Sequence, residues 1–238
     1  WRLRRAYKSG FDVVHVHTGH AHALALLAGL ALPQAPPLIV SRRVDFPIKG
    51  GKLGRLKYGR RVERFIPISY RVRDVLLAGG VPAERMDMVY SGVRPERFAE
   101  VSSHCLRREL GLDPDVRLIA FIGALVDHKA PADLLAALER LPDRVHVVLA
   151  GDGPNLEDLR RQALGLRLRG RVHFLGHRDD VPVILQNADL FCVPSRMEGL
   201  GTSVLDAMAA GVPVVATHAG GIPEMVEHGH SGLSVSPG

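Results

Sequence analysis

Hydrophobic and polar positions divide the chain into short apolar runs and amphipathic stretches that follow one another in alternation. Short apolar runs bounded by glycine, proline or polar residues are typical of buried strands, and apolar residues three and four positions apart indicate helices. The strands expected on this basis are 11–17, 37–41, 65–69, 86–90, 116–122, 145–150, 172–174, 190–193 and 212–216. The expected helices are 21–32, 72–78, 106–110, 131–140, 156–164, 181–186 and 202–210.

This alternation of strands and helices predicts parallel sheets that are covered by helices on both faces. It occurs twice, because a polar stretch at 94–115 separates two series of elements. We therefore expect an α/β protein of two Rossmann-like domains facing a cleft, residues 1–94 and 95–238. Ligands of such domains bind at the carboxyl ends of the strands.

Composition narrows the class of protein. The 238 residues are 46% hydrophobic, which is enough for a sizeable core, and no apolar run is long enough to cross a membrane. The chain begins at Trp1 and stops in a predicted turn, so we expect a fragment that lacks both termini. Two cysteines, Cys105 and Cys192, cannot form a disulfide framework, which fits a reducing, cytoplasmic compartment. A net charge of +6 suits an anionic partner.

Two glycine-containing loops follow predicted strands. In the first, 123–131, Lys129 stands just before a helix, where α/β sheets bind anions, and its ammonium can reach a diphosphate. A solvated lysine is the alternative, which the helix dipole disfavours. In the second, Gly151 and Gly153 would let backbone approach a ligand, although an ordinary turn needs the same residues. Because Leu156 leaves Gly-x-Gly-x-x-Gly incomplete, a nicotinamide site is not expected.

The most specific signal is the stretch 198–216, with Glu198 on a glycine-rich loop and Asp206 in the helix that follows. If the whole segment were helical, these acids would lie about 12 Å apart, which suits two anchors on an extended ligand better than an acid/base pair. Thr202 or Ser203 is expected to cap the helix, whose free amides would receive a diphosphate. An acid that merely complements the helix dipole would explain Asp206 alone.

Four histidines, at positions 15, 17, 20 and 22, have a spacing that resembles a metal site. However, His15 and His17 would share one strand face, and no Asp, Glu or Cys stands close by in sequence. We expect no metal here, and we expect His17 to line the cleft toward an acceptor or a donor sugar.

The segment 42–64 is rich in cations. It could attract an anionic membrane surface or an anionic acceptor, or it could be a solvated helix face with a charged loop. Few aromatic residues interrupt it, so nucleic acid is not expected as a partner. The cations are Arg42, Arg43, Lys49, Lys52, Arg55, Lys57, Arg60, Arg61 and Arg64.

Taken in order, segments 123–129, 151–153 and 198–211 resemble the C-terminal half of family 4 glycosyltransferases of the GT-B fold. His15, His17, Ser69 and segment 91–93 fit the preceding half, so the resemblance covers nearly the whole chain. It implies a retaining enzyme that takes a nucleotide-diphosphate sugar and needs no metal or other cofactor. The implied acceptor is a polysaccharide, a lipopolysaccharide or a lipid-linked sugar at the inner face of a membrane.

The resemblance also implies roles for individual residues. Lys129 would contact the donor diphosphate, Glu198 the transferred sugar and Asp206 the ribose, while the backbone of 174–178 would meet the base. The expected catalytic residues are Glu198, Lys129 and His17, and Arg43 lies on the acceptor side. The expected donor-binding residues are Gly92, Gly123, Lys129, Gly151, Gly153, Gly176, His177, Arg178, Glu198, Gly199, Leu200, Gly201, Thr202, Ser203 and Asp206.

Some positions depart from the family pattern. Asp206 stands where a second Glu is usual, Ala124 where an Arg commonly follows the strand, and Arg43 where a His is often found. A donor-binding pseudoenzyme and a GT-B sugar-nucleotide epimerase therefore remain alternatives, and a basic nucleic-acid-binding module is the least expected. The isolated chain is expected to be inactive.

Overall fold

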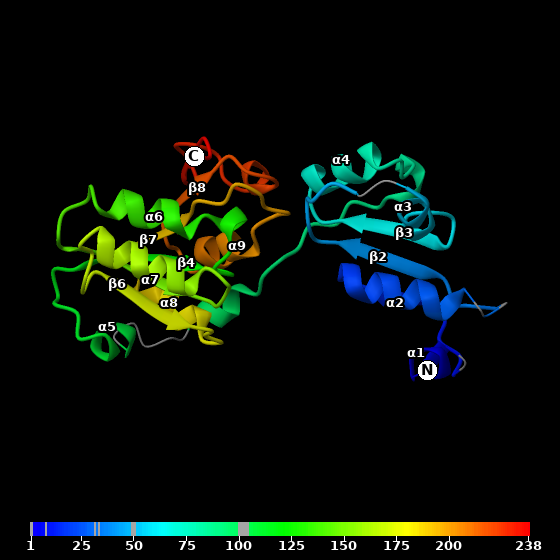
Figure 1. The fold of residues 1–238 in the computed structure, drawn as a ribbon, viewed down its shortest axis with the longest axis horizontal. Coiled ribbons are helices and arrows are strands. Elements are labelled where there is room, and N and C mark those ends of the chain that lie inside the picture. The colour runs from blue at the N-terminus through cyan, green and yellow to red at the C-terminus, as the bar shows by residue number, and fades with distance from the viewer. Residues whose placement is uncertain (1, 8, 31, 33, 49–50, 100–104) are drawn as a thin grey trace. The chain divides into compact units, whose positions relative to one another are not determined.

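The computed structural model describes residues 1–238 except 1, 8, 31, 33, 49–50 and 100–104. The chain forms two compact units, Trp1–Ser91 and Gly92–Gly238, and each is considered by itself (Figure 1). Both units are of the α/β type, and every strand pairing that the structure describes is parallel. No helix among the described residues is both long and apolar enough to cross a membrane.

The first unit has a parallel sheet in the order β1-β2-β3. Thr18 and Ser69 cap the helices that follow β1 and β3, each accepting a hydrogen bond from an amide three residues on. Fully buried side chains such as Val62, Phe65 and Leu76 form its core. The elements are α1 (Arg2–Tyr7), β1 (Val14–Val16), α2 (Gly19–Gly29), β2 (Leu38–Arg42), α3 (Lys52–Lys57), β3 (Val62–Pro67), α4 (Tyr70–Ala78) and the 3-10 turn η1 (Ala83–Arg85).

The strand expected at 86–90 does not form. Met86 makes one isolated bridge to Phe65, and the amides of Asp87 and Val89 donate to carbonyls of β3. The side chains of Val89 and Tyr90 stay about half exposed, so little apolar burial holds this segment against the sheet. The first expected strand is also shorter than its apolar run, because Phe11 and Val13 lie exposed ahead of β1.

The second unit contains a six-stranded sheet in the order β6-β5-β4-β7-β8-β9. Its elements follow the alternation that the sequence predicts, with β9 and the 3-10 turns η2, η3 and η4 as additions. They are η2 (Pro95–Phe98), α5 (Cys105–Glu109), β4 (Arg117–Ile122), η3 (Asp127–Lys129), α6 (Pro131–Leu138), β5 (Val145–Ala150), α7 (Leu156–Gly165), β6 (Val172–Gly176), α8 (Val181–Asn187), β7 (Leu190–Val193), α9 (Thr202–Ala209), β8 (Val214–Thr217), η4 (Ile222–Glu224) and β9 (Leu233–Val235).

Alternate residues of the central strands enter two cores, one on each face of this sheet. Along β4, Leu118 and Ala120 join the core made with α8 and α9, whereas Ile119 and Phe121 join the core made with α6 and α7. A strand that is buried on both faces explains why residues 118–122 are apolar without polar alternation. The result is a rigid platform whose strand ends carry the loops of the candidate site.

Candidate functional site

The sheet of the second unit has a switch point between β4 and β7. From β4 the chain proceeds outward through β5 and β6, and it then returns to the other side of β4 as β7. At such a point two neighbouring loops diverge at the carboxyl end of the sheet, which is where open α/β sheets bind ligands. Lys129 lies in the connection after β4, and Glu198 lies in the one after β7.

These two residues, distant in sequence, form an ion pair between Lys129 Nζ and Glu198 Oε2. The Lys129 side chain is 23% exposed and that of Glu198 is 11% exposed. The two loops are also joined through the backbone, because the carbonyl of His128 accepts hydrogen bonds from the amides of Arg196 and Met197 at 2.8 and 3.3 Å. The structure thus brings together two of the residues to which the sequence analysis assigned donor contacts.

Both the main chain and the side chain of Glu198 are held by hydrogen bonds. Its carbonyl accepts a 3.0 Å hydrogen bond from the amide of Gly221, and Ser195 Oγ donates a long 3.5 Å bond to its carboxylate. Gly220 has a φ of +57°, and a Cβ there would fall 1.5 Å from the Glu198 carbonyl oxygen. Only glycine fits at position 220, so the loop after β8 holds Glu198 in place.

The glycines of the loops after β4 and β5 serve first to pack those loops together. A Cβ on Gly151 would lie 2.0 Å from the carbonyl oxygen of Gly123, and one on Gly153 would lie 2.3 Å from that of Leu125. The Leu125 amide donates to the Asp152 carbonyl at 2.9 Å. The close approach that these glycines allow is therefore between two protein loops, and contact of Gly123, Gly151 and Gly153 with a donor stays a prediction.

Helix α9 begins differently from the expectation. Its N-cap is Gly201, with a φ of +88°, and no side chain makes a capping hydrogen bond, so the predicted caps at Thr202 and Ser203 are wrong. Both residues instead occupy the first turn of the helix. Since Gly201 adopts a left-handed conformation, the chain enters the helix without a capping side chain, which leaves its N-terminus open to an anion. Gly199 and the buried Leu200 precede this start on the loop.

Asp206 lies in α9 beside a partner that the motifs did not reveal. Arg97, on η2, places Nη1 3.8 Å from Asp206 Oδ1, an ion pair too long for a hydrogen bond. That oxygen is buried and has no hydrogen-bond partner among the described residues. Burial raises the pKa of Asp206, and the nearby Arg97 charge counteracts this rise. Asp206 is thus a buried acceptor with unused capacity.

The loop after β6 engages its arginine within the protein. Arg178 donates to both oxygens of Asp180 and to the carboxylate of Glu109 on α5. These bonds raise the pKa of Arg178 and lower that of Asp180. His177 is exposed and pairs with Asp179 at 3.2 Å, while the carbonyl of Gly176 accepts from the Gly151 amide. Any contact of this loop with a base therefore falls to its backbone rather than to Arg178.

In the first unit, His17 and Arg43 line one pocket of about 280 Å³ at the carboxyl ends of β1 and β2. His15 and His17 share a strand face as expected, with ring centroids 4.2 Å apart, and His15 Nε2 lies 2.9 Å from Ser41 Oγ. No group of three potential metal-ligating side chains occurs in the part of the chain that the structure describes. Gly92 is exposed and begins the second unit.

Two further residues line this pocket, His22 and Arg42, which the sequence analysis named only as members of the histidine cluster and of the basic segment. Both are buried, and among the described residues neither His22 Nε2 nor Arg42 Nε has a hydrogen-bond partner. Arg42 directs its other nitrogens to the Tyr58 hydroxyl and the Phe46 carbonyl. Burial, with the nearby Lys57 charge, lowers the pKa of His22 to about 4. None of the described lining residues is acidic.

The basic segment is not one uniform solvated face. Arg42 is buried, Lys57 Nζ donates to the Gly19 carbonyl, and Arg64 pairs with Asp87. Arg43, Arg60 and Arg61 are exposed. Lys49 and the side chains of Lys52 and Arg55 lie outside the described residues.

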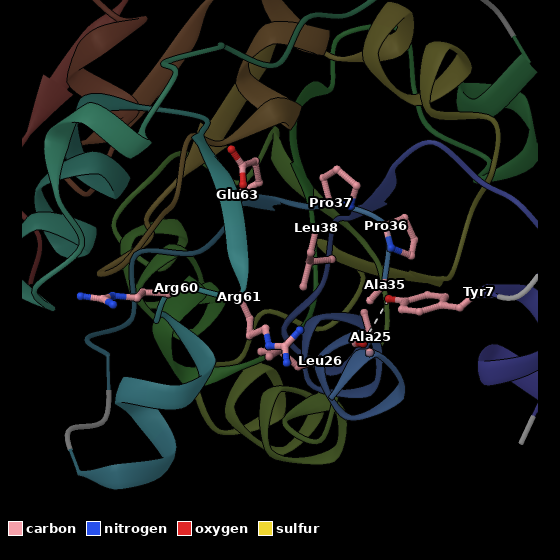
Figure 2. A pocket seen from close by; sticks show the side chains of 11 residues that line it. Tyr7, Ala25, Leu26, Ala35, Pro36, Pro37, Leu38, Arg60, Arg61 and Glu63 are labelled. Carbon is pink, nitrogen blue, oxygen red and sulfur yellow. Dashed lines mark hydrogen bonds between the residues drawn. The ribbon is translucent and has the colours of Figure 1, made fainter. Parts of the chain in front are cut away.

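A second pocket of the first unit, also of about 280 Å³, lies at the opposite, amino end of β2 (Figure 2). Tyr7 crosses it and donates a hydrogen bond to the Ala25 carbonyl at 3.1 Å, while Arg61 lies just before β3 and Glu63 at its start. It contains none of the residues that the sequence predicted for the site. Its position at the amino ends of the strands is not where parallel α/β sheets bind ligands.

The parallel α/β sheets of the two units are those of GT-B glycosyltransferases, the fold of the solved structures to which this chain is similar. Residues 104–238 match the family described as glycosyl transferases group 1, and residues 1–97 match Glycosyltransferase Family 4. The chain belongs to this glycosyltransferase family.

Known proteins agree with this assignment. D-inositol 3-phosphate glycosyltransferase of Mycolicibacterium gilvum is 34% identical over 229 residues, covering 92% of this chain and 49% of that protein. The chain thus spans about half the length of the curated relatives it matches. The structure of Anabaena Alr3699/HepE in complex with UDP-glucose superposes with a TM-score of 0.90 at 26% identity, over all of this chain and 67% of that one. The galactosyltransferase WaaB shares the fold, with a TM-score of 0.70 at 19% identity, over all of this chain and 65% of that one.

Proposed function

We propose that the protein is a retaining glycosyltransferase that moves a hexosyl group from a nucleotide-diphosphate sugar to a polysaccharide, lipopolysaccharide or lipid-linked acceptor. The observation that carries the proposal is the pairing of Lys129 with Glu198 at the switch point of the second unit. A cation and an acid are then available side by side, one for a diphosphate and one for sugar hydroxyls. The UDP-glucose complex of the Anabaena relative supports a uridine donor.

In the proposed mechanism, the acceptor hydroxyl attacks the anomeric carbon on the face from which the diphosphate leaves. The bond from that carbon to the phosphate oxygen breaks, and the hydroxyl proton passes to the departing phosphate. Lys129 and the uncapped start of α9 stabilise the charge that develops on the diphosphate. Glu198 orients the sugar, and Asp206, whose buried oxygen lacks a hydrogen-bond partner among the described residues, accepts from a ribose hydroxyl.

We assign donor binding to residues 95–238 and acceptor binding to residues 1–94. The acceptor assignment is supported by the pocket that His17 and Arg43 line, with His22 and Arg42 beneath them. A pocket with buried, unpartnered nitrogens and no acidic lining residue among those described favours an acceptor that carries an anionic group. The phosphate in the name of the curated relatives is consistent with such an acceptor.

Contact with an anionic membrane is a further part of the proposal. Val44, Phe46 and Leu56 expose apolar side chains in the same segment as the exposed Arg43, Arg60 and Arg61. Surfaces that bind anionic membranes peripherally combine exposed apolar side chains with cations. Co-sedimentation with phosphatidylglycerol vesicles, but not with phosphatidylcholine vesicles, would support it, and equal recovery with both would contradict it.

The donor proposal is tested by nucleotide-sugar binding to the full-length protein, measured by thermal shift and titration calorimetry over a panel of donors. We expect one nucleotide sugar to stabilise the protein and this stabilisation to be lost in Lys129→Ala. Glu157→Gln, which alters an exposed pair with Arg160 on α7, serves as a surface control. If no nucleotide sugar binds the wild-type protein, the proposal fails.

A further inference from the structure

The ion pair at the switch point has a role beyond holding two loops together. We propose that Lys129 and Glu198 exchange partners during turnover, so that the site holds a nucleotide sugar more tightly than the nucleotide diphosphate product. This proposal rests on the proposed function, because it assigns the diphosphate to Lys129 and the sugar to Glu198. It makes the pair a determinant of substrate-over-product selectivity.

The backbones at both ends of the pair are fixed, so the exchange is confined to side chains. The Lys129 amide donates to the Val126 carbonyl at 3.0 Å, and the preceding carbonyl, of His128, receives the amides from the loop after β7. Ala130 follows in a left-handed conformation, with a φ of +49°. Gly220 and Gly221 hold the main chain of Glu198 from the other side. The lysine side chain, with four rotatable bonds, is the partner that can move.

The Glu198 carboxylate is too buried to lose its cation without cost. It is 11% exposed, and apart from Lys129 it contacts Ser195 Oγ at 3.5 Å. Ser195 is fully buried, with its carbonyl engaged by Thr217 Oγ1, so it cannot move much closer. A buried carboxylate that loses its cation is strongly destabilised unless other donors replace it.

The neighbouring arginine does not take the place of Lys129. Arg196, two residues before Glu198, directs its guanidinium to both oxygens of Asp133 at 3.0 and 3.1 Å. Ala124 adds no charge to the loop after β4. Lys129 must therefore serve either Glu198 or a diphosphate, according to what else occupies the site.

The charges of Lys129 and Glu198 are therefore partnered differently when the substrate and when the product is bound. With a nucleotide sugar bound, sugar hydroxyls donate to Glu198 while the Lys129 ammonium turns to the diphosphate, and both protein charges stay partnered. With the bare diphosphate, either Lys129 remains on Glu198 and the phosphates lack this cation, or it moves and leaves Glu198 underpartnered. Both outcomes weaken the binding of the product, and re-formation of the ion pair favours its release.

The experiment compares UDP with UDP-glucose by titration calorimetry on the full-length protein. Glu198→Gln removes the competing charge and keeps the shape of the side chain, so we expect UDP to bind roughly two- to fivefold more tightly than to wild type, which corresponds to the loss of one ion pair. UDP-glucose should bind no more tightly than to wild type, so the preference for the sugar nucleotide shrinks. Glu157→Gln makes the same chemical change in an exposed pair and should alter neither affinity.

Three results would overturn the proposal. Unchanged or weaker UDP binding in folded Glu198→Gln would show that no exchange occurs, while the donor proposal would survive. Failure of wild type to bind UDP and every nucleotide sugar tested would remove both. If Glu198→Gln does not fold, the wild-type protein provides the test. The proposal predicts that the product inhibition constant of UDP exceeds the dissociation constant of UDP-glucose, and the opposite order would contradict it.

Discussion

The two units differ in how their buried polar side chains are partnered. In the second unit, Lys129 and Glu198 neutralise each other at the switch point, and this site contains its own counter-ion. In the first unit, Arg42 and His22 are buried in a pocket where a nitrogen of each lacks a hydrogen-bond partner among the described residues. A site closed by its own ion pair must exchange partners to bind a ligand, whereas a site with unpartnered nitrogens gains partners when a ligand binds. We therefore expect ligand binding to the first unit to add contacts without breaking any, whereas ligand binding to the second unit must first open the Lys129–Glu198 pair.

The largest effect should come from breaking the support of Glu198. Gly220→Ala combines a positive φ with a Cβ placed 1.5 Å from the Glu198 carbonyl oxygen, so we expect a loss of roughly 3 kcal/mol or more in unfolding free energy, together with loss of donor binding. Gly211→Ala is the matched control, since its φ is +71° but nothing lies within 4 Å of the new Cβ. It should cost about 1 kcal/mol and spare binding. Equal urea midpoints for the two variants would contradict this account of the loop.

The next effect concerns His22, the buried histidine of the first unit. The pKa of His22 is lowered from 6.5 to about 4, so the unfolded chain binds the proton more readily than the folded one. Neutral His22 contributes favourably to the free energy of unfolding above pH 6.5. This contribution is lost as the pH falls toward 4, which lowers the free energy of unfolding by about 3 kcal/mol. Urea unfolding from pH 7 to 4 should therefore be less pH-dependent in His22→Met than in wild type. His20→Ala, which alters an exposed residue, should leave the wild-type dependence intact, and identical curves for wild type and His22→Met would contradict the assignment.

A smaller effect is expected at Arg97. Burial raises the pKa of Asp206 and Arg97 opposes this rise, so Arg97→Met should raise that pKa further. An Asp206 that becomes protonated accepts hydrogen bonds less well, and donor affinity should begin to fall at a higher pH than in wild type as acid is added. We expect the loss to stay within about 1 kcal/mol because Arg97 is half exposed. Coincident affinity profiles between pH 4 and 7 would remove Arg97 from the site.

The smallest effect on binding is predicted for Arg178. Its guanidinium is engaged by Asp180 and Glu109, so Arg178→Gln should lower the stability of the second unit by about 1 kcal/mol. Nucleotide affinity should hardly change, because any contact of this loop with a base comes from its backbone. A large loss of affinity with unchanged stability would show instead that the side chain reaches the nucleotide.

How far the sequence predicts this molecule depends on the range of the contacts involved. Hydrophobic patterning identified the strands and helices of the second unit from α5 to β8, since a strand buried on both faces, such as β4, is marked by its own residues. The motifs also singled out Lys129 and Glu198, whose chemistry is local to two loops. Local patterning failed at 86–90, where an apolar run lacked a layer to bury it.

Other features depend on partners that no short pattern records. The approach of Arg97 to Asp206 and the clamp of Glu109 on Arg178 join elements far apart in sequence. The burial of Arg42 and His22 follows from packing against Tyr58 and Phe65. The sequence does not indicate this burial, because Arg42 lies in a cation-rich segment that is typical of an exposed surface. Gly201 replaced Thr202 as the helix cap because the loop required a left-handed residue there, which depends on the path of the chain around Glu198.

The most direct test of the central claim is a crystal structure of the full-length protein with a non-transferable nucleotide sugar. The account predicts the diphosphate within hydrogen-bonding distance of Lys129 Nζ and a sugar hydroxyl donating to Glu198, with the Lys129–Glu198 pair opened. A donor bound away from the carboxyl ends of β4 and β7, with that pair intact, would contradict it.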